Sequence, residues 1–216
     1  MGDVERAAVE PRSGTRSARK RRAILDAATG LFLRNGYRGT TMDEIATTAA
    51  VSKQTLYRHF SDKERLFRDL VFGIVEVTAA PFQATIQAVE DTDDVERSLA
   101  ELAGAYTAAV MQPALLQLRR LMIGEAGRLP EVARAYYDAA PGRTLATLAT
   151  CFRRLGARGL LRVDDPELAA SHFAFLVFGM PLDRAMFRGG EEEDQAELRR
   201  IADAGCRAFL SLYRQP

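Results

Sequence analysis

The sequence predicts an all-α protein of about nine helices, with a small N-terminal three-helix domain followed by a larger C-terminal helical domain. From residue 17 onward, apolar residues recur every three or four positions, which is the spacing of one helix face. Strand-like alternation is missing, and residues that start or stop helices punctuate the chain. Hydrophobic residues make up 47% of the sequence, which is enough to bury a globular core.

The first predicted helix covers residues 17–35. It follows a basic arm over residues 1–16, whose composition predicts disorder. Ile24 and Phe32 share one apolar face of this helix. Gly36 comes next, at the position where a helix commonly ends on a left-handed residue. The helix is therefore expected to stop there.

Two short helices follow, joined by a turn of three or four residues. Thr41 and Glu44 have the spacing of a capping box, in which each side chain bonds the backbone N–H of the other residue. Ser52 is placed to cap the next helix, which is expected to cover residues 53–60. The segment 41–60 therefore predicts a helix-turn-helix.

The second of these short helices is expected to bury Leu56 and Phe60 and to expose a polar face. That face consists of Lys53, Gln54, Thr55, Tyr57, Arg58 and His59. Side chains of these types donate to phosphates and to the base edges of nucleic acids. A polar face that is merely solvated is the alternative, and the helix-turn-helix pattern and the basic charge of the segment argue against it.

The charge distribution indicates a polyanionic partner for the N-terminal segment. The whole chain has a net charge of +1. Residues 11–60 contain ten Lys or Arg and three Asp or Glu, a net charge of +7, so the remainder of the chain carries −6. One basic segment on an otherwise acidic protein is typical of nucleic acid binding.

The rest of the chain also predicts helices. Ser61 and Glu64 again have capping-box spacing, which predicts a fourth helix that ends at Pro81. Five later helices are expected, and they begin at Asp93, Pro113, Pro130, Asp165 and residues 191–193. The helix from Pro130 is expected to kink or break at Pro141, and the helix from Asp165 is expected to end at Gly179 and Pro181.

Several side chains in this part of the sequence are candidates for lining a small-molecule cavity, although each alone is better explained by ordinary packing. They are Tyr106, Met122, Tyr136, Phe152, His172, Phe175 and Phe178. Cys151 and Cys206 lack the spacing of a metal site or a disulfide framework, and no catalytic constellation is visible. We therefore expect no enzymatic activity, no metal and no cofactor, and a location in the reducing cytoplasm.

Residues 20–70 resemble the tetracycline-repressor (TetR) family of bacterial transcriptional regulators. The matching runs are 22–28, 31–32, 35–37, 40–46, 51–60 (VSKQTLYRHF) and 63–66. Ala50 departs from the family pattern, because a glycine is usual at this turn position, and Gln54 stands where a smaller residue is common. The run 120–131 is similar to a subset of the family related to multidrug-efflux regulators.

The resemblance implies a DNA-binding domain over residues 17–64 and an effector-binding and dimerisation domain over residues 65–216. It places Thr40 and Thr41 at the phosphate-contacting start of the second helix, and Tyr57 and Lys63 at further phosphates. The base-facing residues that it implies are Gln54, Thr55, Arg58 and His59.

The predicted function is that of a homodimeric repressor, which binds a palindromic operator on double-stranded DNA and is released by a small hydrophobic effector. The resemblance implies that the last two helices form the dimer interface. The first of them is apolar on nearly every side, so one side is expected to face another subunit or a ligand rather than water. The final helix carries a stripe of Leu198, Ile201, Gly205, Ala208 and Leu212. No membrane partner is expected. A helix-turn-helix regulator that acts through protein partners without a ligand is the alternative, and an all-helical enzyme is a third class without visible catalytic residues.

Overall fold

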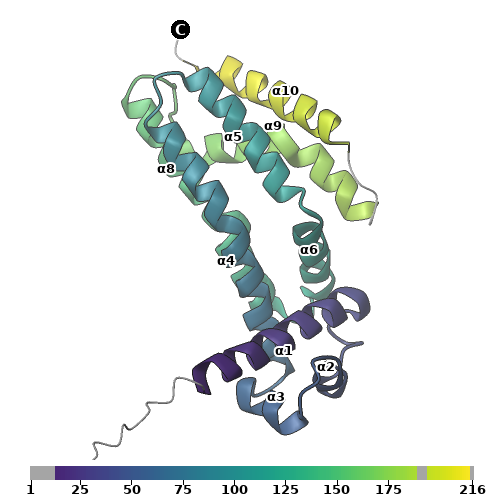
Figure 1. The fold of residues 1–216 in the computed structure, drawn as a ribbon. Coiled ribbons are helices and arrows are strands. Elements are labelled where there is room, and N and C mark those ends of the chain that lie inside the picture. The colour runs from purple at the N-terminus through teal and green to yellow at the C-terminus, as the bar shows by residue number, and fades with distance from the viewer. Residues whose placement is uncertain (1–12, 189–193, 215–216) are drawn as a thin grey trace, which may run out of the picture. The chain divides into compact units, whose positions relative to one another are not determined.

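The computed structural model describes residues 13–188 and 194–214, without the side chains of residues 13–15 and 77–83. Within these ranges the chain forms ten α-helices, a short π-helical segment and no β-strand (Figure 1). The predicted all-α class is confirmed, and the number of helices is close to the nine expected. None of the helices in the described ranges is both long and apolar enough to cross a membrane.

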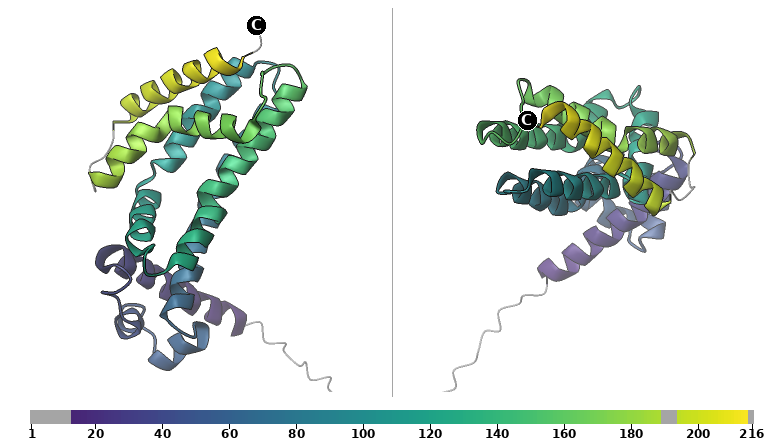
Figure 2. Two further views of the ribbon diagram at one scale, coloured as in Figure 1. Left: turned by 180° about the vertical axis from the view of Figure 1, so that it is seen from behind. Right: turned by 90° about the horizontal axis from the view of Figure 1, so that it is seen from above.

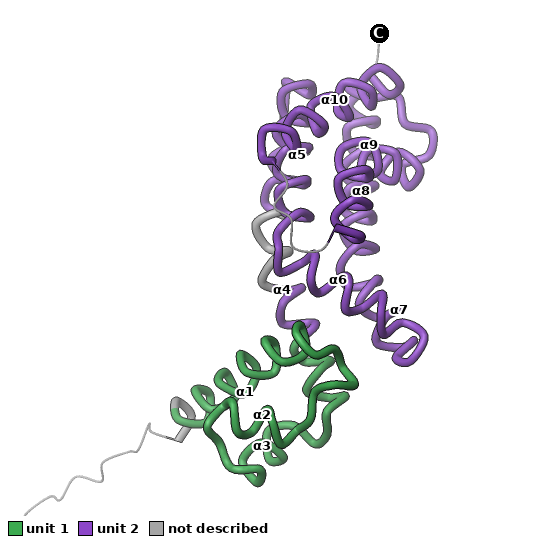
Figure 3. Tube along the Cα trace, turned by 90° about the vertical axis from the view of Figure 1, so that its right-hand side faces the viewer, with its two compact units in different colours: residues 1–70 green, residues 71–216 purple. Residues whose placement is uncertain are grey.

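The chain divides into two compact units, residues 1–70 and 71–216 (Figure 3). This division falls inside a helix, a few residues after the domain boundary that the sequence suggested at residue 64. Of the basic arm expected over residues 1–16, residues 1–12 lie outside the described part of the chain. Residues 13–16 already belong to the first helix.

The first unit consists of α1 (Ser13–Asn35), α2 (Met42–Thr48), α3 (Lys53–His59) and the first turns of α4 (Lys63–Glu90). Its core is formed by side chains that are almost fully buried, namely Ile24, Phe32, Ile45, Leu56, Phe60, Leu66 and Phe67. Gly36 ends α1 with a φ of 71°, and its N–H donates to the carbonyl of Phe32 at 3.0 Å. The expected left-handed residue after the first helix is therefore present.

Helix α4 differs from the expectation at both ends. Its cap is Asp62, whose Oδ1 accepts the N–H of Arg65 at 2.7 Å, while the hydroxyl of Ser61 donates to the same carboxylate. The capping box expected from Ser61 and Glu64 was thus wrong by one residue, because a carboxylate competes for the free N–H groups of the first turn. The helix also continues through Pro81 to Glu90.

In the second unit, α9 (Pro166–Phe187) packs against α5 (Val95–Val110), α8 (Arg143–Ala157) and α10 (Gln195–Tyr213) (Figure 2). One ring from each of three helices meets at the centre of this bundle. Phe152 of α8, Phe173 of α9 and Phe209 of α10 have ring centroids 5.1–5.5 Å apart and are fully buried. Edge-to-face and tilted rings at these distances stabilise the core beyond simple area burial.

The unit also contains the later turns of α4 and two further helices, α6 (Pro113–Glu125) and α7 (Pro130–Tyr137). A π-helical segment, Asp138–Gly142, separates α7 from α8 and contains Pro141. The break expected at this proline is confirmed, and it accounts for the tenth helix. Proline disrupts the regular ladder because it lacks a backbone N–H and clashes with the preceding turn.

The ends of the last two helices were predicted less well. Helix α9 runs through Gly179 and Pro181 to Phe187, so the stop expected there was wrong. Pro181 is itself buried, and burial of the surrounding apolar side chains offsets the hydrogen bond that proline removes. The start expected at residues 191–193 lies outside the described residues; α10 begins at Gln195, capped by Asp194.

Gly205 lets α10 approach α9 closely within one subunit. A Cβ atom at this position would lie 2.2 Å from the carbonyl oxygen of Leu176. Leu198 and Gly205 of the predicted interface stripe therefore face the core of their own chain. Ile201 and Ala208 are half-buried, and Leu212 is exposed.

Candidate DNA-binding face and apolar cavity

The turn between α2 and α3 is closed by a pair of backbone hydrogen bonds typical of a Schellman motif. The N–H of Val51 donates to the carbonyl of Ala46 at 3.0 Å, and that of Ala50 donates to Thr47 at 3.1 Å. Ala50 has a φ of 52°, the left-handed conformation that this motif requires. The tight turn therefore forms without the usual glycine, at a cost of about 1–2 kcal/mol for the alanine side chain.

Side-chain caps and one ion pair hold the two short helices in place. The N–H of Glu44 donates to Thr41 Oγ1 at 3.2 Å and the N–H of Thr41 donates to Glu44 Oε2 at 2.8 Å, so the predicted capping box is present. Ser52 Oγ accepts the N–H of Thr55 at 3.2 Å. Lys53 Nζ lies 2.6 Å from a carboxylate oxygen of Asp43, which links α3 to α2.

Helix α3 turns its apolar residues inward and its polar residues outward. Leu56 and Phe60 are buried, as the sequence predicted. The opposite face exposes Lys53, Gln54 and Arg58, together with Tyr57 at 50% of its surface, whereas Thr55 and His59 are half-buried. Donors, hydroxyls and a guanidinium thus lie together on the face of a two-turn helix.

His59 lies in a positively charged environment. Partial burial, followed by the charges of Arg58, Arg21 and Lys20, holds the pKa of its imidazole below the ordinary value. Its Nε2 atom is buried and has no hydrogen-bond partner among the described residues. The ring is therefore neutral near pH 7 in the free protein.

The remaining predicted DNA contacts have different environments. Thr41 is exposed, but Thr40 is fully buried and its hydroxyl donates to the carbonyl of Gly36 at 2.9 Å. Lys63 Nζ donates to the carbonyls of Tyr37 and Thr40, both at 2.9 Å, and lies 4.3 Å from the centroid of the Tyr37 ring. Thr40 and Lys63 therefore hold the segment between α1 and α2 in place.

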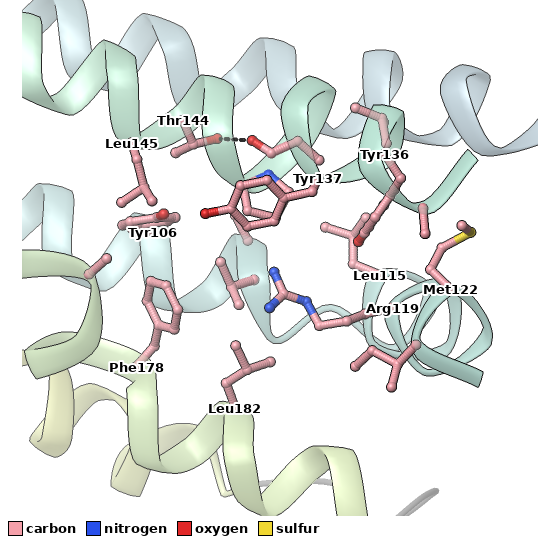
Figure 4. A pocket seen from close by; sticks show the side chains of 18 of the residues that line it. Tyr106, Leu115, Arg119, Met122, Tyr136, Tyr137, Thr144, Leu145, Phe178 and Leu182 are labelled. Atoms are coloured by element: carbon pink, nitrogen blue, oxygen red, sulfur yellow. Dashed lines mark hydrogen bonds between the residues drawn. The ribbon is translucent and has the colours of Figure 1, made fainter. Parts of the chain in front are cut away.

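The second unit contains a cavity of about 430 Å³ (Figure 4). Its walls come from α4, α5, α6, α7, α8, α9 and the π-helical segment, and most of them are apolar. The polar side chains that reach it are those of Tyr106, Arg119, Tyr136, Tyr137 and Thr144. Burial raises the pKa of Tyr106 and of Tyr136, and the nearby charge of Arg119 partly opposes both shifts.

Five of the seven predicted cavity residues line this space, namely Tyr106, Met122, Tyr136, Phe175 and Phe178. The other two lie elsewhere. Phe152 belongs to the aromatic core described above. His172 is exposed on α9, where its Nδ1 lies 2.7 Å from the hydroxyl of Tyr213.

The predicted cavity residues did not include Arg119, which is the one charged residue among those that line the cavity in the described part of the chain. A signal was available. Leu115, Arg119 and Met122 are spaced by four and three residues, so all three share one helix face. A cation within an otherwise apolar stripe is unfavourable to bury, so its presence indicates a functional role.

A large apolar surface covers one side of α9. Phe175 is exposed over 72% of its surface, Met180 over 69% and Phe187 over 84%, and Leu168 and Leu176 extend the same patch. Exposed apolar patches on a soluble protein mark interaction surfaces. Phe175 also lines the cavity, so the cavity wall and this surface share a side chain.

The cysteines belong to neither feature. Burial raises the pKa of the Cys151 thiol to about 12 and that of Cys206 to about 11, so both are inert near pH 7. Among the described residues, no group of three His, Cys, Asp or Glu side chains is arranged to hold a metal ion.

Models of two protein families match the chain. Residues 24–70 match the family of bacterial regulatory proteins described as tetR, and residues 97–215 match the C-terminal domain of AefR-like transcriptional repressors.

Solved structures agree with these matches over nearly the whole chain. A TetR-family transcriptional regulator from Mesorhizobium loti is 43% identical, with a TM-score of 0.86 over 93% of this chain and 99% of its own. The flavonoid-responsive regulator FrrA is 30% identical, with a TM-score of 0.73 over 91% of this chain and 98% of its own.

Among curated proteins, the HTH-type transcriptional regulator UidR of Escherichia coli is 33% identical over 82 residues, which is 38% of this chain and 42% of UidR. The chain thus covers about two fifths of this relative. The N-terminal and C-terminal family matches, together with structural neighbours that cover the whole fold, show that the chain belongs to the TetR family of DNA-binding, dimeric transcriptional regulators.

Proposed function

We propose that the protein is a repressor whose affinity for a palindromic operator is controlled by a small, largely apolar effector bound in the cavity of the second unit. The cavity is the observation that carries this proposal. Its volume of about 430 Å³ falls within the range of small-molecule sites, roughly 300–1,000 Å³, and its apolar walls with a few converging polar groups have the composition of such sites. The similarity to a regulator named as flavonoid-responsive supports the same proposal.

On the operator, the exposed face of α3 enters the major groove in this proposal. Gln54, Thr55, Arg58 and His59 contact base edges, and Thr41, Lys53 and Tyr57 contact phosphates. Lys63 has a third N–H available for a phosphate besides the two carbonyls that it already bonds. Thr40 acts through its buried hydrogen bond, which positions Thr41, rather than by touching DNA.

The homodimer forms in this proposal through the exposed apolar surface of α9 and the adjoining side of α10. Phe175, Met180 and Phe187 would lose their large exposed areas on dimerisation, at roughly 25 cal/mol per Å² of apolar surface. Ile201, Ala208 and Leu212 supply the contribution of α10. The dimer acts on chromosomal DNA in the cytoplasm and needs no cofactor.

In this proposal, helix α4 transmits effector binding to the DNA-binding residues, because it contains residues of both units. It is continuous from Lys63 to Glu90, and Val75 lines the cavity. A ligand that shifts α4 changes the position of the residues that precede it in the chain. A coupling free energy of about 1–3 kcal/mol, which is a 5–150-fold change in affinity, is typical of such linkage.

The test uses the full-length protein and DNA from upstream of its own gene. Compounds are first selected by the rise in melting temperature that they cause, because a ligand that binds the native state stabilises it. Fluorescence anisotropy then measures operator affinity with and without each binder. We expect a 5–150-fold loss of affinity and, reciprocally, an equal loss of ligand affinity on operator DNA. If no binder alters operator affinity, the ligand-independent regulator that acts through protein partners replaces this proposal.

A further inference from the structure

The guanidinium of Arg119 has an unusual position in this molecule. Arg119 lies on α6, and its side chain extends into the cavity among Leu115, Leu182 and Tyr137 (Figure 4). None of the residues that line the cavity in the described ranges is acidic. No carboxylate of the described residues lies within 4 Å of this guanidinium. The charge is thus placed beside apolar walls without an ion-pair partner.

Several other arginines of the second unit bond to a carbonyl or pair with a carboxylate. The neighbouring Arg120 donates to the carbonyl of Ala185 at 2.7 Å, and Arg128 pairs with Glu125 at 3.2 Å. Arg153 pairs with Glu167 at 2.8 Å. Arg119 is half-buried, and a charge that is partly removed from water and left without a counter-ion lowers stability. Arg119 is therefore better explained by a partner that arrives with a ligand than by folding.

Two phenols lie near the same guanidinium. The charge of Arg119 acts on the side chains of both Tyr136 and Tyr106 and opposes the rise of their pKa values. Burial raises the pKa of Tyr136, so this phenol stays protonated near neutral pH and retains an O–H donor. A guanidinium and the phenol O–H of Tyr136 that line one cavity form a donor set suited to a carboxylate.

We infer that the effector is an apolar carboxylic acid, whose carboxylate binds Arg119 and whose hydrocarbon skeleton fills the cavity toward Leu145, Phe178 and Leu182. The inference rests on the proposed function, because it names the class of effector for that cavity. Arg119 is the residue that sets specificity for acids over neutral compounds. The cavity volume suits a bicyclic aromatic skeleton or a chain of about ten to twelve carbons.

The experiment compares each acid with its own primary amide, so that shape is constant and charge is not. The pairs are 2-naphthoic acid, biphenyl-4-carboxylic acid and dodecanoic acid with their amides, measured by calorimetry on the full-length protein. We expect at least one acid to bind about 10- to 150-fold more tightly than its amide, which is the effect of hydrogen bonds to a charged group.

Arg119→Met should abolish this preference by lowering the affinity for the acid, and Arg119→Lys should retain part of the preference. Arg134→Met is the matched control, because Arg134 is an exposed arginine of α7 that does not line the cavity. The ligand-free melting temperature of Arg119→Met should equal or exceed that of the unaltered protein. A fall of several degrees in both Arg119 variants would show that the residue is structural and would overturn the inference.

Operator anisotropy separates this inference from the proposed function. If amides bind as tightly as acids, and release the operator in the Arg119→Met variant as well, the effector is neutral and the inference fails while the proposed function stands. If neither acids nor amides bind, the inference fails regardless of what other compounds do. If acids bind through Arg119 but leave operator affinity unchanged, the carboxylate site stands and its role as effector site fails.

Discussion

The DNA-binding face of the first unit and the cavity of the second unit are built in different ways. The residues of the face lie mainly on α3, with Thr41 at the cap of α2 and Lys63 at the start of α4. The two short helices are each held by a cap that acts over three residues, Thr41 with Glu44 and Ser52 with Thr55. The cavity is lined by residues between Val75 and Leu182 that belong to seven helical segments. Local patterns therefore specify the face, whereas the cavity depends on how distant helices pack.

The α9 surface gives the largest expected effect. Met180→Glu should place a charge within the proposed dimer interface and yield monomers in sedimentation at micromolar concentration. Operator affinity should fall by about 100-fold or more, because a monomer binds one half-site and gains no affinity from a second, linked contact. Ala208→Glu should act in the same direction. A Met180→Glu protein that remains dimeric would move the interface away from this surface.

Phe152→Ala separates the core from the cavity. Phe152 is fully buried against Phe173 and Phe209, so the truncation should lower the free energy of unfolding by about 3–5 kcal/mol. Tyr137→Ala is the control, because Tyr137 lines the cavity, is 55% exposed and lies outside the proposed dimer interface. Urea denaturation measures both. Equal costs for the two variants would contradict the division between core and cavity.

Arg58→Ala tests whether the exposed face of α3 reads bases. The change should cost about 1–3 kcal/mol of operator binding and relax sequence preference, while stability stays within about 0.5 kcal/mol. Lys63→Ala should lower the melting temperature as well, because Lys63 bonds the carbonyls of Tyr37 and Thr40. Its removal should weaken binding to all sequences alike. Anisotropy on operator and scrambled DNA distinguishes the two behaviours.

Ala50→Gly tests the cost of the helix-turn-helix turn. Glycine adopts the left-handed conformation of residue 50 without steric strain, so the free energy of unfolding should rise by about 1 kcal/mol. Part of the gain is lost because glycine has greater conformational freedom in the unfolded chain. Thermal unfolding measures the change. Ala49→Gly, one residue earlier in a right-handed helical conformation, should instead destabilise the protein.

The smallest expected effect is a pH dependence of operator binding through His59. Its pKa is lowered in the free protein by burial and by neighbouring cations. Nearby phosphates would favour the protonated ring and raise this pKa, so binding takes up a proton and affinity should rise as the pH falls from about 7.5 to 5.5. The rise should be less than tenfold and should be absent in His59→Gln. An equal rise in that variant would assign it to another group.

The all-α class, the helix-turn-helix and its caps followed from the sequence, because helix periodicity and capping act over three or four residues. The same local rules failed at Pro81 and Pro181, where each helix continues past its proline. Around Pro181, burial of apolar side chains outweighs one lost hydrogen bond. The cap of α4 was displaced from Ser61 to Asp62 for a local reason, the stronger acceptor.

By itself, the sequence determined which residues form the exposed face of α3, because Leu56 and Phe60 define the buried side of a two-turn helix. The tertiary structure alone decided which aromatic residues become core and which line the cavity. Phe152 and Phe178 are both buried phenylalanines on helices, yet Phe152 is enclosed by two other rings whereas Phe178, which packs against Tyr106, also borders the cavity. The physical reason is that the position of a residue on its helix determines which way its side chain points. The neighbours of that side chain depend on the packing of helices that are far apart in the sequence.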